Sequence, residues 1–402
     1  MQINFRNFLK YTIIKTAMLG FLLSWDTPNA NGQSAVQLDW QEKLIMAEKG
    51  DTILLPAGSY QLTQTLSMDR KEDVTILGAG SAETILSFEN QIDGGEGLRI
   101  TNGKNITLQG LTIIDATGDA VKAQYVDGIV FNDISTRWSG KPSKNNGAYG
   151  LYPVQCKNVL IDHCYAYGAS DAGIYVGQSD QVIVRNSTAE GNVAGIEIEN
   201  TTNAEVYDNI AHSNTGGILI FDLPDLEKKK GGQVKVYQNQ IVENNYKNFA
   251  PKGNIVAQVP PGTGIMIMAT SDVEIYRNTI SNNRTINSAV MSYYITELEI
   301  KDEAYNPYPS RIYIHDNEFD RKKKWPLLKN KFGWLFFFKF GKKIPNIVYD
   351  GILHDNATDG SGKLTSEYEI CISNNRGETF ANLDAAHKFK QLTRDISLFQ
   401  CQ

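Results

Sequence analysis

The sequence predicts an all-β fold in which short parallel strands stack as a three-sided solenoid. The first observation is a repeated phrase that opens on glycine and closes on asparagine, GIYVGQSDQVIVRN from Gly173 and GIEIENTTNAEVYDN from Gly195. The second is a series of seven pairs of strand-like segments; in six pairs the second segment begins eight residues after the first. A repeat of 20 to 50 residues is typical of solenoids, because each unit needs its neighbours to bury its apolar face.

The paired segments define the coils of this solenoid. Uninterrupted repeats are 22 or 23 residues long, and Ile218 to Val234 is the one longer offset because DLPDLEKKKGG is inserted there. Within each segment apolar residues alternate, so one set of side chains faces inward and the other outward. A β-sandwich is the alternative, but the constant offset and the lack of hairpin dipeptides between strands favour stacked coils. The first segments begin at Leu98, Val121, Leu151, Ile174, Ile196, Ile218 and Ile265; the second segments begin at Ile106, Ile129, Val159, Val182, Ala204, Val234 and Val273.

Glycine and asparagine recur at fixed places in the repeat. We expect the glycines before the first segments to adopt positive φ in a tight bend. We expect the asparagines after the second segments to hydrogen-bond to one another up the stack. The glycines are Gly97, Gly150, Gly173, Gly195, Gly217 and Gly264, and the asparagines are Asn209, Asn239, Asn278, Asn317 and Asn375.

Both ends of the stack depart from the repeat. Residues 38–48 have helical spacing of apolar residues and predict a helix that caps the first coil. Regular coils are expected over 74–320, a basic aromatic insertion over 321–346, and the last coil and C-terminal tail over 347–402. Within the insertion, 321–343 has nine Lys and Arg, seven aromatic residues and no acid. It is open whether this segment is a lid, a membrane-surface contact, a partner-docking element or a loop packed on the flank.

The N-terminus predicts export. Residues 1–32 read as a signal peptide, with a basic start, a short apolar run over Thr16–Trp25 and a cleavage site near Gln33. The run is too short to span a bilayer, so we expect no transmembrane segment. Residues 33–402 then form one monomeric β-helix domain that is secreted, periplasmic or held at the cell envelope. The net charge of −6 argues against a nucleic-acid partner.

Four cysteines fit an oxidising compartment. Cys371 and Cys401 could tie down the C-terminal tail, although four cysteines allow three connectivities. We expect Cys156 and Cys164 to be buried free thiols.

GDTILLPAGSY, followed by coils of the form GIxI…VxIxxN, resembles the right-handed parallel β-helix proteins of secreted type. That group includes pectate lyases, polygalacturonases and mannuronan C5-epimerases. GAYGLYPVQC, SDAGIYVGQS, VAGIEIEN, TGGILIFDLP and VPPGTGIMIMA are similar to a bacterial family of secreted parallel β-helix repeat proteins. The resemblance covers roughly residues 50–320. It implies a right-handed, single-stranded parallel β-helix but no particular reaction, and the polysaccharide chemistry of the wider group rests on analogy.

The outward positions of the first segments form two candidate columns. One column predicts a substrate-binding surface from Arg99, Lys122, Tyr152 and Tyr175, with Asp171 and Asp222 beside it. Glu197 and Glu199 are the candidate catalytic pair together with Tyr175, because strand rise places the two glutamates roughly 6.6–7 Å apart, a separation used by inverting glycosidases. The alternative is ordinary amphipathic alternation with solvated glutamates. The columns are Arg99, Lys122, Tyr152, Tyr175, Glu197, Leu219 and Met266, and Thr101, Gln124, Val154, Gly177, Glu199, Phe221 and Met268.

A second candidate is DHCYAYGASD, which brings His163, Tyr165, Tyr167 and Asp171 close in sequence. Tyr or His can abstract a proton beside a carboxylate, as in lyases and epimerases. His163 also occupies a corner of the repeat, which favours a structural role. We expect no cofactor or metal, apart from Ca²⁺ that Asp171 and Asp222 could hold.

Two functions follow from these residues. In the first, the protein binds an extracellular or envelope polysaccharide on its exposed sheet face and modifies it as a lyase, epimerase or hydrolase. In the alternative, it is a non-catalytic scaffold that binds a glycan or an envelope protein. The sequence alone leaves both open.

Overall fold

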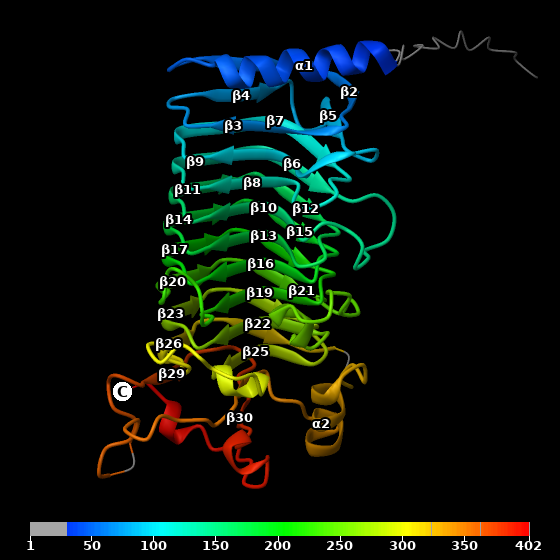
Figure 1. Cartoon of the computed structure of the whole chain (residues 1–402). Coiled ribbons are helices and arrows are strands. Elements are labelled where there is room, and N and C mark those ends of the chain that lie inside the picture. Colours follow the sequence, from blue (N-terminus) through cyan, green and yellow to red (C-terminus); the bar gives the residue numbers. More distant parts are fainter. Residues whose placement is uncertain (1–29, 323, 362, 402) are drawn as a thin grey trace, which may run out of the picture.

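The computed structural model describes residues 30–322, 324–361 and 363–401. Over these residues the chain winds into a tall stack of coils, with helix α1 (Ala30–Met46) across one end and helix α2 (Lys331–Phe340) beside the other (Figure 1). The paired strands of the stack are parallel. The prediction of a right-handed parallel β-helix is therefore confirmed. None of the described helices is both long and apolar enough to cross a membrane.

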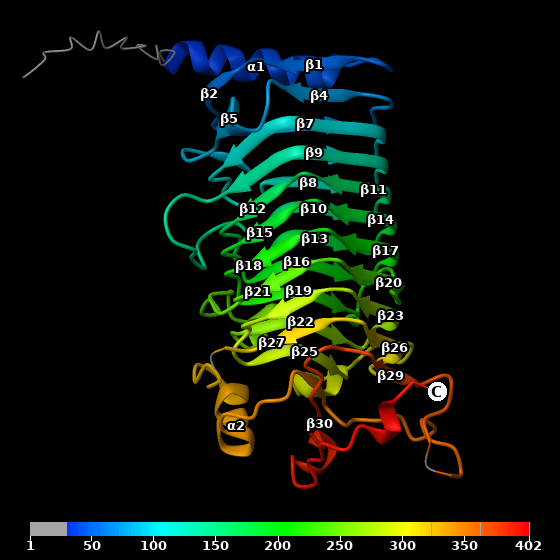
Figure 2. The same ribbon diagram turned by 180° about the vertical axis from the view of Figure 1, so that it is seen from behind.

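Each coil contributes strands to three sides, and the reverse view shows β7 (Lys104–Ile114) and β9 (Asp127–Arg137) each bending around one corner of the stack (Figure 2). β7 and β9 bend around that corner, which merges two sides into one 19-stranded sheet. The remaining side is an 11-stranded sheet of β3 (Gln64–Asp69), β6 (Asp93–Thr101), β8 (Val121–Gln124), β10 (Tyr149–Val154), β13 (Ala172–Gly177), β16 (Ala194–Glu199), β19 (Gly216–Phe221), β22 (Thr263–Met268), β25 (Ile286–Met291), β28 (Ile347–Tyr349) and β30 (Phe380–Asn382).

The 19-stranded sheet supplies the other two sides. Strands of one set come after the 11-stranded sheet in each coil and are called the longer strands here, because most of them have six residues or more. Strands of the other set complete the coil and are called the shorter strands, because most of them have three residues. The longer strands are β1 (Thr52–Leu55), β4 (Thr75–Gly78), β7 (Lys104–Ile114), β9 (Asp127–Arg137), β11 (Lys157–Asp162), β14 (Asp180–Arg185), β17 (Thr202–Tyr207), β20 (Gly232–Tyr237), β23 (Ser271–Tyr276), β26 (Ser310–His315) and β29 (Ile370–Ser373). The shorter ones are β2 (Gly58–Gln61), β5 (Thr84–Ser87), β12 (Tyr165–Tyr167), β15 (Thr188–Glu190), β18 (Ile210–His212), β21 (Gln240–Val242), β24 (Thr279–Ser281) and β27 (Glu318–Asp320).

The ends of the stack differ in detail from the prediction. The capping helix is confirmed, since Trp40 and Leu44 of α1 are buried in the main core, but it begins at Ala30 rather than at residue 38. Most of the expected signal peptide, residues 1–29, lies outside the described residues. Strands of the stack begin at β1, before the regular coils expected over 74–320, and end at β30, inside the range 347–402 where the last coil was expected.

The glycines before the strands are needed for a different reason from the one predicted. Gly195 and Gly217 are absent from the residues with positive φ, so the expectation of a left-handed bend there is wrong. Instead, a Cβ on Gly195 would lie 2.6 Å from the carbonyl oxygen of Gly217 in the next coil, and a Cβ on Gly217 would lie 2.6 Å from that of Gly264. Glycine is required here because stacked backbones approach too closely for any side chain.

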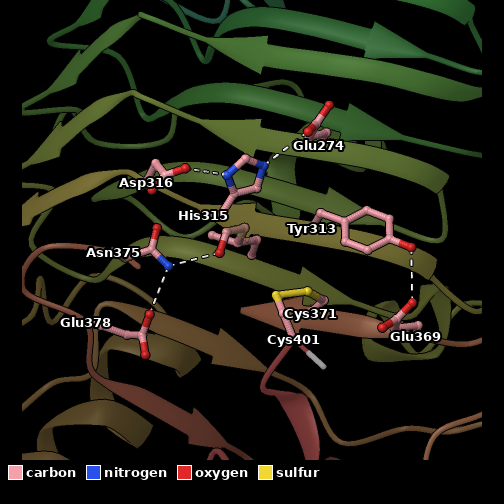
Figure 3. The surroundings of a disulfide bond; sticks show 10 residues. Glu274, Tyr313, His315, Asp316, Glu369, Cys371, Asn375, Glu378 and Cys401 are labelled. Carbon is pink, nitrogen blue, oxygen red and sulfur yellow. Dashed lines mark hydrogen bonds and ion pairs between the residues drawn. A yellow bond between two sulfur atoms is a disulfide. The ribbon is translucent and has the colours of Figure 1, made fainter. Parts of the chain in front are cut away.

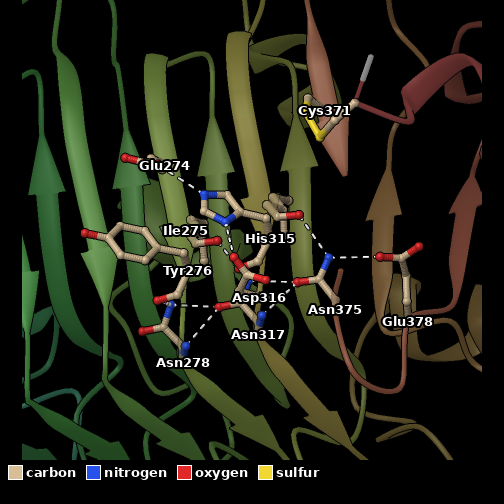
Figure 4. A network of polar contacts seen from close by, with 12 residues as sticks. Glu274, Ile275, Tyr276, Asn278, His315, Asp316, Asn317, Cys371, Asn375 and Glu378 are labelled. Carbon is tan, nitrogen blue, oxygen red and sulfur yellow. Dashed lines mark hydrogen bonds and ion pairs between the residues drawn. A yellow bond between two sulfur atoms is a disulfide. The ribbon is translucent and has the colours of Figure 1, made fainter. Parts of the chain in front are cut away.

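The predicted asparagine ladder is present between β17 and β29. Each side-chain amide donates to the next. Asn239 Nδ2 lies 3.0 Å from Asn278 Oδ1. Asn278 Nδ2 lies 3.0 Å from Asn317 Oδ1 (Figure 4). A second ladder, which the sequence analysis missed, runs up the next corner. Its members are Asn192, Asn214, Asn244, Asn283, Asn287 and Asn346. These bonds satisfy buried amides while holding successive coils in register.

A disulfide fastens the C-terminal tail to the stack. Cys371 in β29 is bonded to Cys401, which is one of the three connectivities that the sequence left open (Figure 3). Cys156 and Cys164 are buried free thiols, as predicted. The tail is thus joined covalently to the last strand of the longer side.

Long connections leave the stack only beside the 11-stranded sheet in the coils from β10 to β27. The turns between longer and shorter strands, such as Asp162 to Tyr165, always contain two residues there. By contrast, long connections precede strands of the 11-stranded sheet at 138–148, 243–262 and 321–346. Long connections follow strands of that sheet at 222–231 and 292–309. These segments determine which part of that sheet meets solvent.

Candidate functional site

Both predicted columns are present on the outer face of the 11-stranded sheet. Tyr175 pairs in register with Glu197, and Gly177 pairs with Glu199. The same registers continue from Arg99 through Lys122 to Tyr152 in one direction and from Glu197 to Leu219 and Met266 in the other. Residues about two dozen positions apart are therefore vertical neighbours, as the repeat requires.

Three tyrosines gather where the columns meet the acids. The ring centroids of Tyr152 and Tyr175 are 5.0 Å apart, and Tyr149 lies 4.4 Å from Tyr152 and 4.6 Å from Tyr175. Tyr149 was not predicted, because strict alternation along β10 would place it on the face opposite to that of Tyr152. Tyr149 and Tyr152 are half-buried, whereas Tyr175 is buried.

One end of this face is open. Arg99 is exposed and Lys122 is half-buried, and Lys122 Nζ lies 5.1 Å from the ring centroid of Tyr152. Asp119 stands beside Lys122, and burial raises the pKa of Asp119 to about 6 in spite of that lysine. This end therefore combines cationic groups with aromatic rings that are still within reach of solvent.

The other end is covered, which corrects the expectation that the glutamates lie on an exposed face. Glu197 is 1% exposed and Glu199 7% exposed, and Asp171 and Asp222 are buried as well. The segment 243–262 packs over this half, since Phe249, Val256 and Val259 join a second apolar cluster with Tyr175 and Leu219. The sequence pattern predicts which face a side chain takes but not what a distant segment places on top of it.

Protein donors hold three of the four acids. Tyr175 donates from its hydroxyl to Glu199 Oε1 at 2.6 Å, and Asn254 Nδ2 donates to Asp171 Oδ2 at 2.8 Å. The backbone N–H of Gly231 donates to Asp222 Oδ2 at 2.9 Å. Glu197 differs, because its Oε2 is buried without a hydrogen-bond partner among the described residues. A buried, unpartnered carboxyl oxygen favours the protonated state.

The electrostatics of the four acids follow from burial. Burial is the largest cause that raises the pKa of Glu199 to about 7, and Asp171 and Asp222 add to it, while the Tyr175 hydrogen bond opposes it. Burial likewise raises the pKa of Asp171 to about 6 and that of Asp222 to about 7. The pKa of Glu197 lies well above its usual range because of burial, with Asp171 and Glu199 adding to the effect. At neutral pH the cluster holds protons that solvent-exposed acids would have released.

The structure does not bring His163 into this cluster. His163 follows β11 in a left-handed turn and is exposed. Its Nδ1 lies 2.8 Å from Asp162 Oδ1. Tyr165 donates instead to Glu190 Oε2, at 2.9 Å, on the short side of the coil. Of the DHCYAYGASD residues, only Asp171 reaches the acids. In the part of the chain that is described, no three His, Cys, Asp or Glu side chains are grouped to hold a metal.

Comparison with known proteins supports the fold. A family model described as the right-handed beta helix region matches residues 96–250. The A-module of the mannuronan C-5 epimerase AlgE6 from Azotobacter vinelandii is similar over 86% of this chain and 90% of its own, with 14% identity and a TM-score of 0.50. The AlgE4 A-module of the same bacterium is similar over 83% of this chain and 87% of its own, with 16% identity and a TM-score of 0.46. An alginate lyase from Paenibacillus sp. strain FPU-7 is similar over 71% of this chain and 95% of its own, with 14% identity and a TM-score of 0.48.

These similarities define the class of protein. The chain is a right-handed parallel β-helix protein, and it shares this fold with the AlgE6 A-module. No sequence in a set of curated proteins matches it. At 14% identity a shared fold carries no reaction with it, so activity must be argued from the site.

Proposed function

We propose that this protein is exported and binds a polysaccharide along the outer face of its 11-stranded sheet, over the open end at Arg99, Lys122 and Tyr152. The observation that carries the proposal is the cluster of Tyr149, Tyr152 and Tyr175 with Lys122 against the Tyr152 ring. Tyrosine rings offer flat, amphipathic surfaces to sugar rings, and Lys122 and Arg99 would favour a glycan that carries carboxylates.

Two further observations support this proposal. The AlgE6 module, which shares the fold, is by name an enzyme of mannuronan, a polysaccharide. The Cys371–Cys401 disulfide fits an oxidising compartment outside the cytoplasm. Secretion, periplasmic residence and attachment to the envelope all satisfy this condition.

Binding is tested with a panel of neutral and uronic-acid polysaccharides by affinity electrophoresis or calorimetry. We expect a uronic-acid polymer to bind, and Tyr152→Ala and Lys122→Gln each to weaken binding at least tenfold. Tyr125→Ala is the matched control, because Tyr125 is an exposed tyrosine outside both columns. Loss of affinity in the control equal to that in Tyr152→Ala, or no binding to any polymer, contradicts the proposal.

Modification of the bound glycan is a second candidate function, favoured by Glu199. A carboxyl group with a pKa of about 7 can both accept and donate a proton at neutral pH, which suits the acid and base steps of a hydrolase, lyase or epimerase. Glu197 would be the protonated partner, because burial raises its pKa and Asp171 and Glu199 add to the effect. Ca²⁺ at Asp171 or Asp222 stays a prediction.

Catalysis requires access to the buried acids. Asn254 in the segment 243–262 contacts Asp171, so this segment must move before a sugar can reach Glu199. Gly253 and Gly262 have φ of +104° and +89°, which gives the segment two positions where the backbone can turn. In the scaffold alternative the segment never opens, and the acids are structural.

Product analysis separates these alternatives. We expect Glu199→Gln to abolish product formation while glycan binding persists. The product is an unsaturated end for a lyase, a reducing end for a hydrolase, and an inverted sugar carbon detected by NMR for an epimerase. Asp350→Asn is the matched control, since Asp350 is an equally buried acid with a raised pKa in the last coils. Binding without any product in the wild-type protein rejects catalysis and leaves the scaffold.

A further inference from the structure

The segment 321–343 concentrates positive charge on an acidic protein. It holds nine of the 39 Lys and Arg residues and none of the 45 acids. Subtracting these nine leaves 30 basic residues against 45 acids elsewhere, so the rest of the chain is strongly negative. Seven lysines of this segment are exposed, namely Lys322, Lys324, Lys329, Lys331, Lys339, Lys342 and Lys343.

Helix α2 within this segment is apolar on two opposite faces. Its inner face is buried against the body of the protein through Gly333, Phe336 and Phe340. Its outer face presents Trp334, 47% exposed, and Phe338, 75% exposed, whose stacked ring centroids are 6.0 Å apart. Packing onto the stack therefore accounts for only one of the two apolar faces.

The residues just before α2 enlarge the outer apolar surface. Trp325 and Leu328 are exposed, and the Trp325 ring lies 5.2 Å from that of Phe337. Lys342 Nζ lies 5.3 Å from the Trp325 ring centroid. The result is one aromatic patch with lysines around it, on a helix that lies beside the C-terminal end of the stack (Figures 1 and 2).

We propose that this patch docks the protein on the surface of an anionic phospholipid bilayer. Tryptophan and phenylalanine enter the interface between headgroups and acyl chains, and lysines beside them pair with anionic headgroups at about 1 kcal/mol each. With 10 residues α2 is about 15 Å long, half the thickness of the hydrocarbon layer, so it lies on the membrane rather than across it.

The test is co-sedimentation of the full chain with vesicles of phosphatidylcholine alone and with vesicles in which roughly a third of the lipid is phosphatidylglycerol. We expect binding only to the anionic vesicles, lost at high salt. Trp334→Ala with Phe338→Ala, and Lys331→Gln with Lys343→Gln, should each weaken it at least tenfold. One matched control is Ile92→Ala, which changes an exposed apolar residue in the loop before β6, far from α2. The other is Lys141→Gln with Lys144→Gln, which changes two exposed lysines outside the segment.

Each outcome decides the proposal. Absence of vesicle binding, equal binding to neutral vesicles, or equal losses in the controls overturns it. The proposal is also overturned if the protein binds a soluble anionic polysaccharide but no vesicles, and if the Trp334 and Phe338 changes remove that binding. The patch would then be a glycan-binding surface. Glycan affinity at Tyr152 is measured on the same variants and should not change, so this proposal and the polysaccharide proposal can fail separately.

Discussion

The hydroxyl of Tyr175 donates a 2.6 Å hydrogen bond to Glu199 Oε1 across two neighbouring coils. Both side chains are buried, and this bond opposes the rise in the pKa of Glu199 that burial causes. The protonation of Glu199 near neutral pH therefore depends on a residue 24 positions earlier in the chain. This relationship leads to the first prediction.

Tyr175→Phe should raise the pKa of Glu199 above about 7, because the carboxylate loses its only side-chain donor. The free energy of unfolding should fall by about 1–2 kcal/mol at pH 8, where Glu199 is otherwise ionised, and by less at pH 5. Carboxyl carbon NMR gives the pKa directly. Tyr313→Phe is the control, because Tyr313 donates to Glu369 in the other sheet; an unchanged Glu199 titration in Tyr175→Phe contradicts the prediction.

Glu199→Gln should reduce the dependence of stability on pH. The folded-state pKa of about 7 lies above the ordinary 4.5, so the folded protein binds more protons between these values and stability falls as pH rises. Glu199 should account for about 3 kcal/mol of that fall, which the neutral glutamine removes. Urea unfolding of wild type and variant from pH 4.5 to 8 measures the difference. Parallel curves for the two proteins would show that the shift is absent.

Gly195→Ala should destabilise the fold by roughly 1–3 kcal/mol, because its Cβ would meet the Gly217 carbonyl oxygen at 2.6 Å. Gly95→Ala is the matched change, since nothing lies within 4 Å of a Cβ there and no positive φ is recorded. Thermal unfolding compares the two. Equal melting temperatures would mean that close stacking is not why glycine occupies this column.

Asn239→Ala should lower the free energy of unfolding by roughly 3 kcal/mol, because it strands the buried amide of Asn209 and removes a donor to Asn278. Asn145→Ala, at an exposed loop position, should have little effect. Chemical denaturation gives both values. A similar small effect at the two sites would show that the ladder adds no stability.

The disulfide should be the only covalent restraint on the C-terminal tail within the described residues. Cys401→Ser should cost about 3–4 kcal/mol for a loop of 30 residues if the tail still packs on β29. Thiol titration checks the pairing independently. Native protein should show no reactive thiol, because Cys156 and Cys164 are buried. Two thiols in denaturant and four after reduction would confirm it, whereas four in denaturant alone would contradict the bond.

The sequence predicted the stack well because its repeat is local. The eight-residue offset is enough to place Tyr175 beside Glu197 and Gly177 beside Glu199. The role of Gly195 was predicted wrongly because residue type does not give the distance between coils. The burial of Glu197 was missed because the segment that covers it is remote, as Asn254 is 83 residues from its partner Asp171. The alternation of residues along a strand predicts which face a side chain takes, whereas the exposure of that side chain depends on segments elsewhere in the chain.

In the described coils from β10 to β27, the long connections leave only at the two ends of the strands of the 11-stranded sheet, while the asparagine-lined corner keeps two-residue turns. Apart from the ladder residues Asn244 and Asn346, the segments 243–262 and 321–346 contribute no strand to the stack. A change in the length of either segment beyond these two residues would therefore alter the surface beside the sheet and leave every strand pairing intact.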